Sequence, residues 1–253
     1  MNNKSPKTAI KKVLGEIPLT AEFYWSVRQQ GKPLSKSFSL QRAQKHLPGW
    51  LAQAKAARAT SALPVDQRKK ILMFTTLRYW VEHSVLLGLG LAGQGHTITL
   101  AYLPLNNWQV PMNRFDLRRQ NAYTHSALQP AEKLLKPVSI LDIKPAMKQL
   151  PSELAAAIEQ VSIRDVQYTL QIEEVDTSSQ LYQLRQQRNT QAALAITSWI
   201  QAHKPDLLLT PNGSILEMGA IYQTARHLGI PAVTYEFGEQ RDRIWLAQNS
   251  EVM

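Results

Sequence analysis

The stretch that decides the fold is residues 204–238, KPDLLLTPNGSILEMGAIYQTARHLGIPAVTYEFG. Residues 207–209 form a short apolar run bounded by turn residues, which is typical of a strand buried on both faces of a parallel sheet. Apolar positions at helical spacing follow over residues 215–228, Gly229 ends the helix, and residues 232–235 form a second strand. A strand–helix–strand unit predicts parallel pairing, with a ligand site at the carboxyl ends of the strands.

Two segments of this unit fall at that predicted site. Ser214 and Glu217, three residues apart, predict a capping box at the helix start. The loop residues Asn212 and Gly213, with Ser214, could bind an anion or sugar hydroxyls at a helix N-terminus. Ordinary turn and cap chemistry would explain the same three residues.

The second segment follows the last strand of the unit. Glu236 places a carboxylate where a buried core would not need one, and Arg241 and Arg243 follow it. The two arginines could meet phosphate groups, or the segment could be a solvated loop.

Residues 69–103, KKILMFTTLRYWVEHSVLLGLGLAGQGHTITLAYL, form a second unit of the same kind. The pattern predicts a strand at residues 71–74, a loop at 75–81 and a helix at 82–94 that Gly95 ends. A second strand follows at 97–102, where β-branched residues are frequent.

Gly88, Gly90 and Gly93 match the dinucleotide-binding fingerprint GxGxxG by letter. That fingerprint requires its glycines at the strand-to-helix turn, where the backbone approaches a pyrophosphate. Here they fall inside the predicted helix. We therefore interpret them as small residues that let the helix lie close to its sheet.

Glu82 and His83 stand at the predicted start of that helix, next to the carboxyl end of a strand. The imidazole of His83 could take a proton from an acceptor hydroxyl, and the Glu82 carboxylate could orient it. Helix-start preference alone would also place a carboxylate there. No two histidines have the spacing of metal ligands, so the sequence predicts no metal site.

The rest of the chain gives weaker patterns. Helices are predicted at residues 116–135, with Pro130 interrupting, at 152–170 and at 179–203. A third strand is predicted at 138–143 and another at 244–248, the latter leading toward a domain boundary.

The net charge of +10 is concentrated near the N-terminus. Residues 1–70 carry 14 Lys/Arg against Glu16, Glu22 and Asp66, whereas the remainder is almost neutral. Residues 1–65 hold no convincing strand, so they are predicted to be a basic helical extension, joined to residues 66–253 through a linker at 60–64.

Aromatic residues lie among the basic residues of this extension, namely Phe23, Tyr24, Trp25, Phe38 and Trp50. Basic segments with such rings can rest on an anionic membrane surface. They can also simply pack their rings on the domain, and binding to nucleic acid is a third, less favoured reading.

Only features that the sequence lacks bear on the cellular compartment of the protein. The chain contains no cysteine, so disulfides and thiolate metal sites are excluded. Residues 1–12 lack the apolar stretch of a secretory signal, and no apolar run approaches the ~20 residues of a membrane-spanning helix. We therefore expect a cytoplasmic protein.

Taken in order, the two units resemble the N-terminal domain of GT-B glycosyltransferases, especially those that make bacterial capsule and other cell-surface polysaccharides. The matching residues are VEHSVLL at 81–87, QGHTITL at 94–100, KPDLLL at 204–209 and GIPAV at 229–233. Tyr79 and Trp80 replace the glycine pair usual in that family. The resemblance covers about residues 69–253.

This resemblance implies an α/β fold with a Rossmann-like, mostly parallel sheet flanked by helices. It implies His83 as the base beside Glu82, with Arg78, Asn212, Gly213, Glu236 and Arg241 contacting the acceptor or lying at an interdomain cleft. The acceptor would be a glycan or a lipid-linked sugar at the cytoplasmic face of the membrane. The family binds its nucleotide-sugar donor in a second Rossmann-like domain, which is expected in cis or in trans, so no cofactor is expected in this chain.

Two other classes of function stay open. One is a sugar-nucleotide epimerase of the same two-domain build. The other is a non-catalytic binding module whose basic arm holds a membrane or an anionic polymer.

Overall fold

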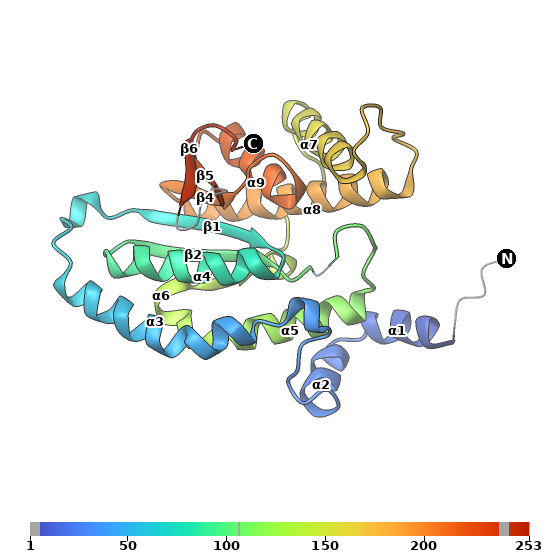
Figure 1. The fold of residues 1–253 in the computed structure, drawn as a ribbon. Helices are drawn as coiled ribbons and strands as arrows, with labels where there is room; N and C mark the ends of the chain where they lie inside the picture. The colour runs from blue at the N-terminus through green and yellow to red at the C-terminus, as the bar shows by residue number, and fades with distance from the viewer. Residues whose placement is uncertain (1–5, 106, 238–242, 253) are drawn as a thin grey trace.

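The structure is a computed structural model that describes residues 6–105, 107–237 and 243–252. In these ranges the chain forms a six-stranded sheet in the order β3-β2-β1-β4-β5-β6, with helices on both of its faces (Figure 1). The strands are β1 Lys70–Thr76, β2 Thr97–Leu103, β3 Pro137–Ser139, β4 Leu207–Pro211, β5 Ala232–Phe237 and β6 Ile244–Gln248. The helices are α1 Pro6–Glu16, α2 Thr20–Val27, α3 Gln41–Thr60, α4 Arg78–Gly93, α5 Arg114–Leu128, α6 Glu132–Leu135, α7 Ser152–Leu170, α8 Gln180–His203 and α9 Leu216–His227.

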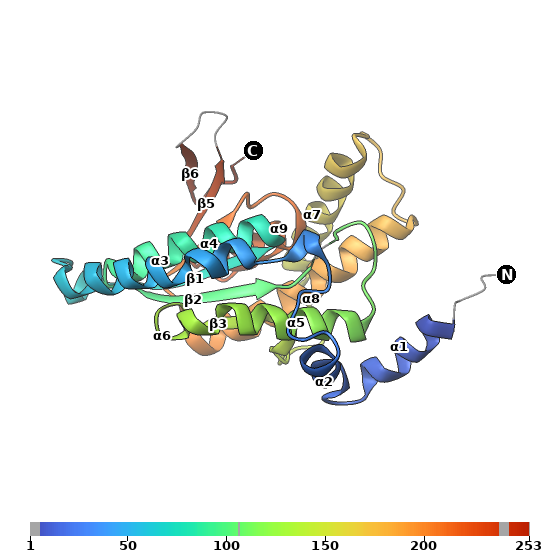
Figure 2. The ribbon, with the colours of Figure 1, turned by 60° about the horizontal axis from the view of Figure 1, so that its bottom comes forward.

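The expected fold class is confirmed. Strands β1 to β5 are mutually parallel, and β6 alone runs antiparallel, paired with β5. Six of the seven residues of β1 are buried, because helices cover both faces of this central strand. The predicted strand at 244–248 is therefore correct as a strand, but it closes a β5–β6 pair at the sheet edge (Figure 2).

Two predicted boundaries are wrong. Strand β1 continues through Thr75 and Thr76, and α4 begins at Arg78, so Leu77 alone connects them and residues 75–81 are not a loop. Strand β3 ends at Ser139, because the Ser139 hydroxyl accepts a hydrogen bond from the Leu141 amide and the chain turns into a 3₁₀ segment.

The glycines of α4 lie where the helix approaches its neighbours. A Cβ on Gly88 would stand 3.0 Å from the Met73 sulfur of β1 and 2.9 Å from a Leu135 methyl carbon. A Cβ on Gly93 would instead meet α3, at 3.3 Å from the Ala54 carbonyl oxygen. Close packing on the sheet is thus confirmed for Gly88 alone, whereas Gly93 packs against α3 and Gly90 has no atom within 4 Å of such a Cβ.

The helices divide between the two faces of the sheet. Figure 1 shows α3, α4, α5 and α6 grouped on one side and α7, α8 and α9 on the other. Helix α4 packs on β1 and β2, whereas α9 packs on β1 and β4. Helices α7, α8 and α9 also pack against one another.

The basic N-terminal segment packs against the rest of the chain. Phe38 and Leu40 are fully buried in the same hydrophobic cluster as the central strands. The Leu40 amide donates to the Tyr123 hydroxyl at 2.7 Å, and Glu22 of α2 pairs with Arg118 of α5 at 2.5 Å. Helices α1 and α2 thus lie against α5 (Figure 2).

This packing limits which aromatic rings of the segment could touch a membrane. Phe38 is buried, Trp50 is partly buried and stacks on His46, and the Trp25 indole donates to the Lys32 carbonyl. Only Phe23 and Tyr24 of the five are exposed. None of the helices within the described ranges is long and apolar enough to cross a membrane.

Candidate functional site

The sheet order creates a switch point between β1 and β4. From β1 the chain proceeds to β2 on one side, and from β4 it proceeds to β5 on the other. In open parallel sheets the loops at such a point separate and leave a crevice at the carboxyl ends of the strands, where ligands bind.

A cavity of about 280 Å³ occupies this position, and we call it the switch-point cavity. Its lining residues come from the loops after β1, β2, β4 and from the end of β5, with one wall from α7. They are Leu77, Tyr79, Trp80, Trp108, Asp165, Tyr168, Thr169, Asn212, Ile215, Leu216, Met218, Glu236 and Phe237.

The loop after β4 is built around Asn212 and Gly213. Asn212 is left-handed at φ 58°, and its side-chain oxygen accepts hydrogen bonds from the amides of Ser214 at 2.8 Å and Ile215 at 3.2 Å. Gly213 has φ 85°, and a Cβ there would stand 2.5 Å from a Thr234 methyl carbon. Glycine is therefore required by both conformation and space.

This turn brings two of the predicted site residues together. The Asn212 side-chain nitrogen donates to the Glu236 carboxylate at 3.3 Å, and both residues line the switch-point cavity. Asn212 is only 7% exposed, so its amide is a fixed part of the wall.

The predicted capping box is wrong. The Ser214 hydroxyl donates to Glu251 at 3.2 Å, and Ile215 is the N-cap residue of α9, without a side-chain cap bond. Glu217 turns away to an ion pair with Arg185 at 3.1 Å. The Asn212 side chain satisfies the loop amides instead, and a buried arginine offers Glu217 a stronger partner than a backbone amide does.

Aromatic rings form much of the cavity wall. Trp80 and Phe237 stack with their centroids 4.7 Å apart and an interplanar angle of 7°. Tyr79, Trp108 and Tyr168 line the same cavity. Trp80 is 3% exposed, whereas Tyr79 and Tyr168 are about half exposed and stand at the mouth.

His83 lies behind this aromatic wall and does not line the cavity. It sits one turn inside α4, with its ring centroid 4.6 Å from that of Phe237 and 5.4 Å from that of Tyr235. Burial lowers the pKa of His83 from its ordinary value of 6.5, so the imidazole is neutral near pH 7. Its Nδ1 is buried without a hydrogen-bond partner among the described residues, and so is one carboxylate oxygen of Glu82.

Neither of the two predicted arginines that the structure describes is among the residues that line the switch-point cavity. Arg78 is exposed at the first position of α4, between the cavity-lining residues Leu77 and Tyr79, and forms no ion pair with a described residue. Arg241 lies outside the described residues. Arg243 is exposed just before β6.

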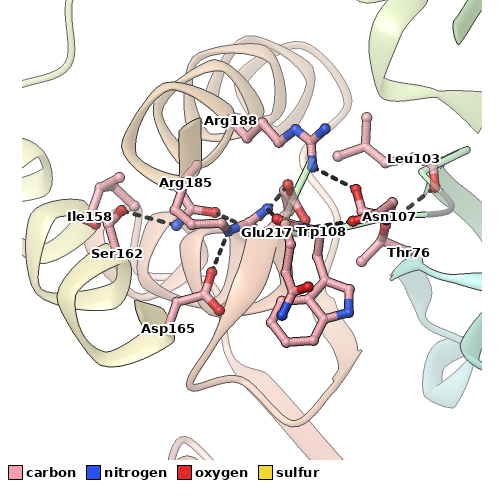
Figure 3. A network of polar contacts seen from close by, with 12 residues as sticks. Thr76, Leu103, Asn107, Trp108, Ile158, Ser162, Asp165, Arg185, Arg188 and Glu217 are labelled. Atoms are coloured by element: carbon pink, nitrogen blue, oxygen red, sulfur yellow. Dashed lines mark hydrogen bonds and ion pairs between the residues drawn. The ribbon is translucent and has the colours of Figure 1, made fainter. Parts of the chain in front are cut away.

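A buried polar network closes the inner wall of the cavity (Figure 3). Arg185 of α8 donates through Nε to Asp165 of α7 at 2.5 Å and pairs with Glu217 of α9 at 3.1 Å. The side chains of all three residues are 1% exposed. A second arginine, Arg188, donates to the main-chain carbonyls of Asn107 at 2.9 Å and Val110 at 3.0 Å.

Burial and the neighbouring charges both shift the pKa values of this network. It raises the pKa of Asp165, although the Arg185 guanidinium opposes the shift. Burial would lower the pKa of Arg185, but the carboxylates of Glu217 and Asp165 raise it further than burial lowers it. Arg185 is therefore held as a cation between two acids.

The same carboxylates define what the N-terminus of α9 can bind. Burial raises the pKa of Asp165, and the Leu216 amide at the first position of α9 opposes only part of that rise. Glu217 follows in the first turn of α9. Asp165 and Glu236 both line the switch-point cavity, so two carboxylates stand where a Rossmann-type sheet would bind a phosphate. This arrangement disfavours an anion and favours groups that donate hydrogen bonds.

Sequence reasoning did not identify Asp165, Arg185, Glu217 or Trp108 as site residues. One signal was available, because Asp165 falls on the same buried helical stripe as Leu154, Ile158, Val161 and Ser162. A charged residue on an apolar stripe indicates a buried partner. Arg185 stands in the same way on the buried stripe of α8.

Within the ranges that the structure describes, no group of three or more His, Asp or Glu side chains could hold a metal ion. No protein-family model matches this chain, and no curated protein and no solved structure matches it either.

Proposed function

We propose that this chain is the acceptor-binding half of a glycosyltransferase of the GT-B build, and that the switch-point cavity holds a sugar of the acceptor. The observation that carries this proposal is the combination of aromatic rings with the Asn212 amide and the Glu236 and Asp165 carboxylates in one cavity.

A sugar suits such a lining for a physical reason. One face of a pyranose ring presents C–H groups, which pack on aromatic rings, while its edge presents hydroxyls that donate to carboxylates. Tyr79, Trp80 and Trp108 supply rings, and Glu236 and Asp165 supply acceptors. Hydrogen bonds to charged acceptors also fix orientation, which an acceptor hydroxyl needs for transfer.

The same lining argues against a nucleotide in this cavity. Two carboxylates, Asp165 and Glu236, line the cavity, and the β1–α4 connection contains Leu77 rather than glycine. The nucleotide-sugar is therefore assigned to a second Rossmann-like domain, in cis or in trans. In this proposal His83 is the base, Arg78 faces the interdomain cleft, and Arg241, which is outside the described residues, is assigned a contact with the acceptor.

The Glu236 carboxylate provides a direct test by isothermal titration with neutral oligosaccharides. Glu236→Gln keeps the size of the side chain but removes the charge, and a hydrogen bond to a charged group contributes about 1.5–3 kcal/mol. We expect the affinity to fall roughly 10- to 100-fold.

The matched control is Glu132→Gln, on the exposed first position of α6, which should bind as the wild type does. Equal affinity for the Glu236→Gln variant, or no binding of any saccharide by the folded wild type, would remove the basis of the proposal.

For location, we propose the cytoplasmic membrane face, with α1 and α2 as the contact. Large apolar side chains are exposed along both helices and the turn between them: Ile10, Val13, Ile17, Leu19, Phe23 and Val27. The basic residues around them would attract anionic headgroups.

Vesicle co-sedimentation tests this contact. The double variant Ile10→Ser, Phe23→Ser should bind vesicles of anionic phospholipid at least tenfold more weakly, because each buried large apolar side chain contributes about 1.5–3 kcal/mol. Val65→Ser, which changes a 77% exposed residue far from α1, is the control. Unchanged co-sedimentation of the double variant would show that these helices do not face the membrane.

A further inference from the structure

A second, larger cavity lies outside the proposed acceptor site. It has a volume of about 460 Å³ and opens beyond the carboxyl ends of β2 and β3. Its inner wall is apolar, formed chiefly by Leu103, Leu105, Ile140, Ile143, Ala192 and Ala195. We call it the α8 cavity, because α8 forms one entire side.

The buried arginine network drawn in Figure 3 contributes one carboxylate to each of the two cavities. Glu217 lines the α8 cavity and Asp165 lines the other, with Arg185 bridging the two carboxylates. The segment after β2 is likewise shared, since Trp108 lines one cavity and Met112 lines the other. The α8 cavity is therefore a site of its own.

The α8 cavity has a polar mouth and an apolar interior. Gln187 and Gln191 are exposed, Arg188 is partly exposed, and Ala192 and Ala195 are buried. The small alanine side chains leave the space that a leucine would fill. The mouth thus offers amides and a guanidinium, and the interior offers methyl groups.

The head group that suits this mouth is uncharged. Arg188 is held by two main-chain carbonyls, and burial lowers its pKa, so its charge is already partly desolvated. Glu217 stands in the same lining with the opposite charge. A carboxylate would meet Glu217 and an ammonium would meet Arg188, whereas a hydroxyl or amide can donate and accept without either repulsion.

We propose that the α8 cavity binds a small amphiphile, with an aliphatic chain against Ala192 and Ala195 and an uncharged hydroxyl or amide head at Gln187 and Gln191. The volume lies within the range of about 300–1,000 Å³ typical of small-molecule sites. This proposal is independent of the saccharide site, so either can fail without the other.

The probe is a series of straight-chain alcohols from butanol to octanol, titrated into the full chain by calorimetry. Burial of one methylene contributes about 0.8 kcal/mol, so each added carbon should tighten binding roughly fourfold. The largest changes in methyl NMR signals should occur at Met112, Ile140 and Ile143.

Charged probes of the same chain length test the head group. Octanoate and octylammonium should each bind more weakly than octanol. Affinity independent of chain length, or tighter binding of either charged probe, would overturn the proposal.

Ala195→Leu fills the cavity and should weaken octanol binding at least tenfold while saccharide affinity stays unchanged. Met112→Trp, at a partly buried position of the lining, serves as a second blocking variant in case Ala195→Leu does not fold. Leu86→Trp, at an exposed position of α4, is the control. Full octanol affinity in a folded blocking variant would contradict the assignment.

Discussion

Replacing Arg185 by methionine should destabilise the folded chain by about 3–5 kcal/mol, because removal of one partner leaves buried charges uncompensated. The side chains of Asp165 and Glu217 are each 1% exposed, and the guanidinium is the cation with which both pair. Methionine has a similar volume, so packing changes little. Urea unfolding followed by circular dichroism at pH 7 measures the loss.

The loss of stability in Arg185→Met should also depend on pH, in a direction that the pKa of Asp165 determines. Burial already raises the pKa of Asp165, and loss of the cation should raise it further. A carboxyl whose folded pKa lies above its unfolded value stabilises the fold at low pH and loses that contribution as pH rises through the folded pKa. The deficit of Arg185→Met should therefore shrink as the pH is lowered from 7 toward 4.

Arg114→Met is the control, since Arg114 and its partner Glu16 are both about 60% exposed. Exposed pairs contribute about 0–1 kcal/mol, so this variant should unfold much as the wild type does. A loss below 1 kcal/mol in Arg185→Met would mean that the two acids are not both ionised in the folded state.

His83→Ala should lower turnover by roughly 10²–10⁴-fold in an enzyme that contains both halves, if His83 is the base. Burial lowers the pKa of His83 below 6.5, so the base should be neutral and competent at pH 7. The acidic limb of the kcat/KM profile should accordingly fall below pH 6.5 in the wild type and disappear in the variant. Steady-state kinetics across pH measure both effects.

His227→Ala, on the exposed last residue of α9, should leave turnover unchanged. His83 stands behind Trp80 and Phe237 rather than in the cavity lining, so its role requires the acceptor hydroxyl to reach past these rings. Wild-type turnover in folded His83→Ala would exclude His83 and move the role to the carboxylate of Glu236 or Asp165.

The sheet was predictable because turn residues and helix-ending glycines mark the limits of its strands and helices in the sequence. Apolar runs at 207–209 and 71–74, with Gly229 and Gly95 after the helices, were enough to place four parallel strands. Asn212 and Glu236 were predictable for a related reason, since the residues after neighbouring parallel strands meet at one edge.

The inner wall of the site was not predictable, because it depends on packing between helices. Asp165, Arg185 and Glu217 come from three different helices and meet only when α7, α8 and α9 pack together. Glu217 shows how a local pattern can mislead. Its spacing from Ser214 fits a capping box, but a buried arginine distant in sequence is its partner.

The most direct test of the account is the set of Trp indole NH signals in a titration with neutral saccharides and, separately, with nucleotides. The chain has six tryptophans, and Trp→Phe variants assign the signals of Trp80 and Trp108. The account predicts that saccharides shift these two signals and that nucleotides leave them unmoved at the same concentration. Shifts at Trp80 and Trp108 with nucleotides alone would contradict it, since they would place a phosphate ligand beside the carboxylates of Asp165 and Glu236.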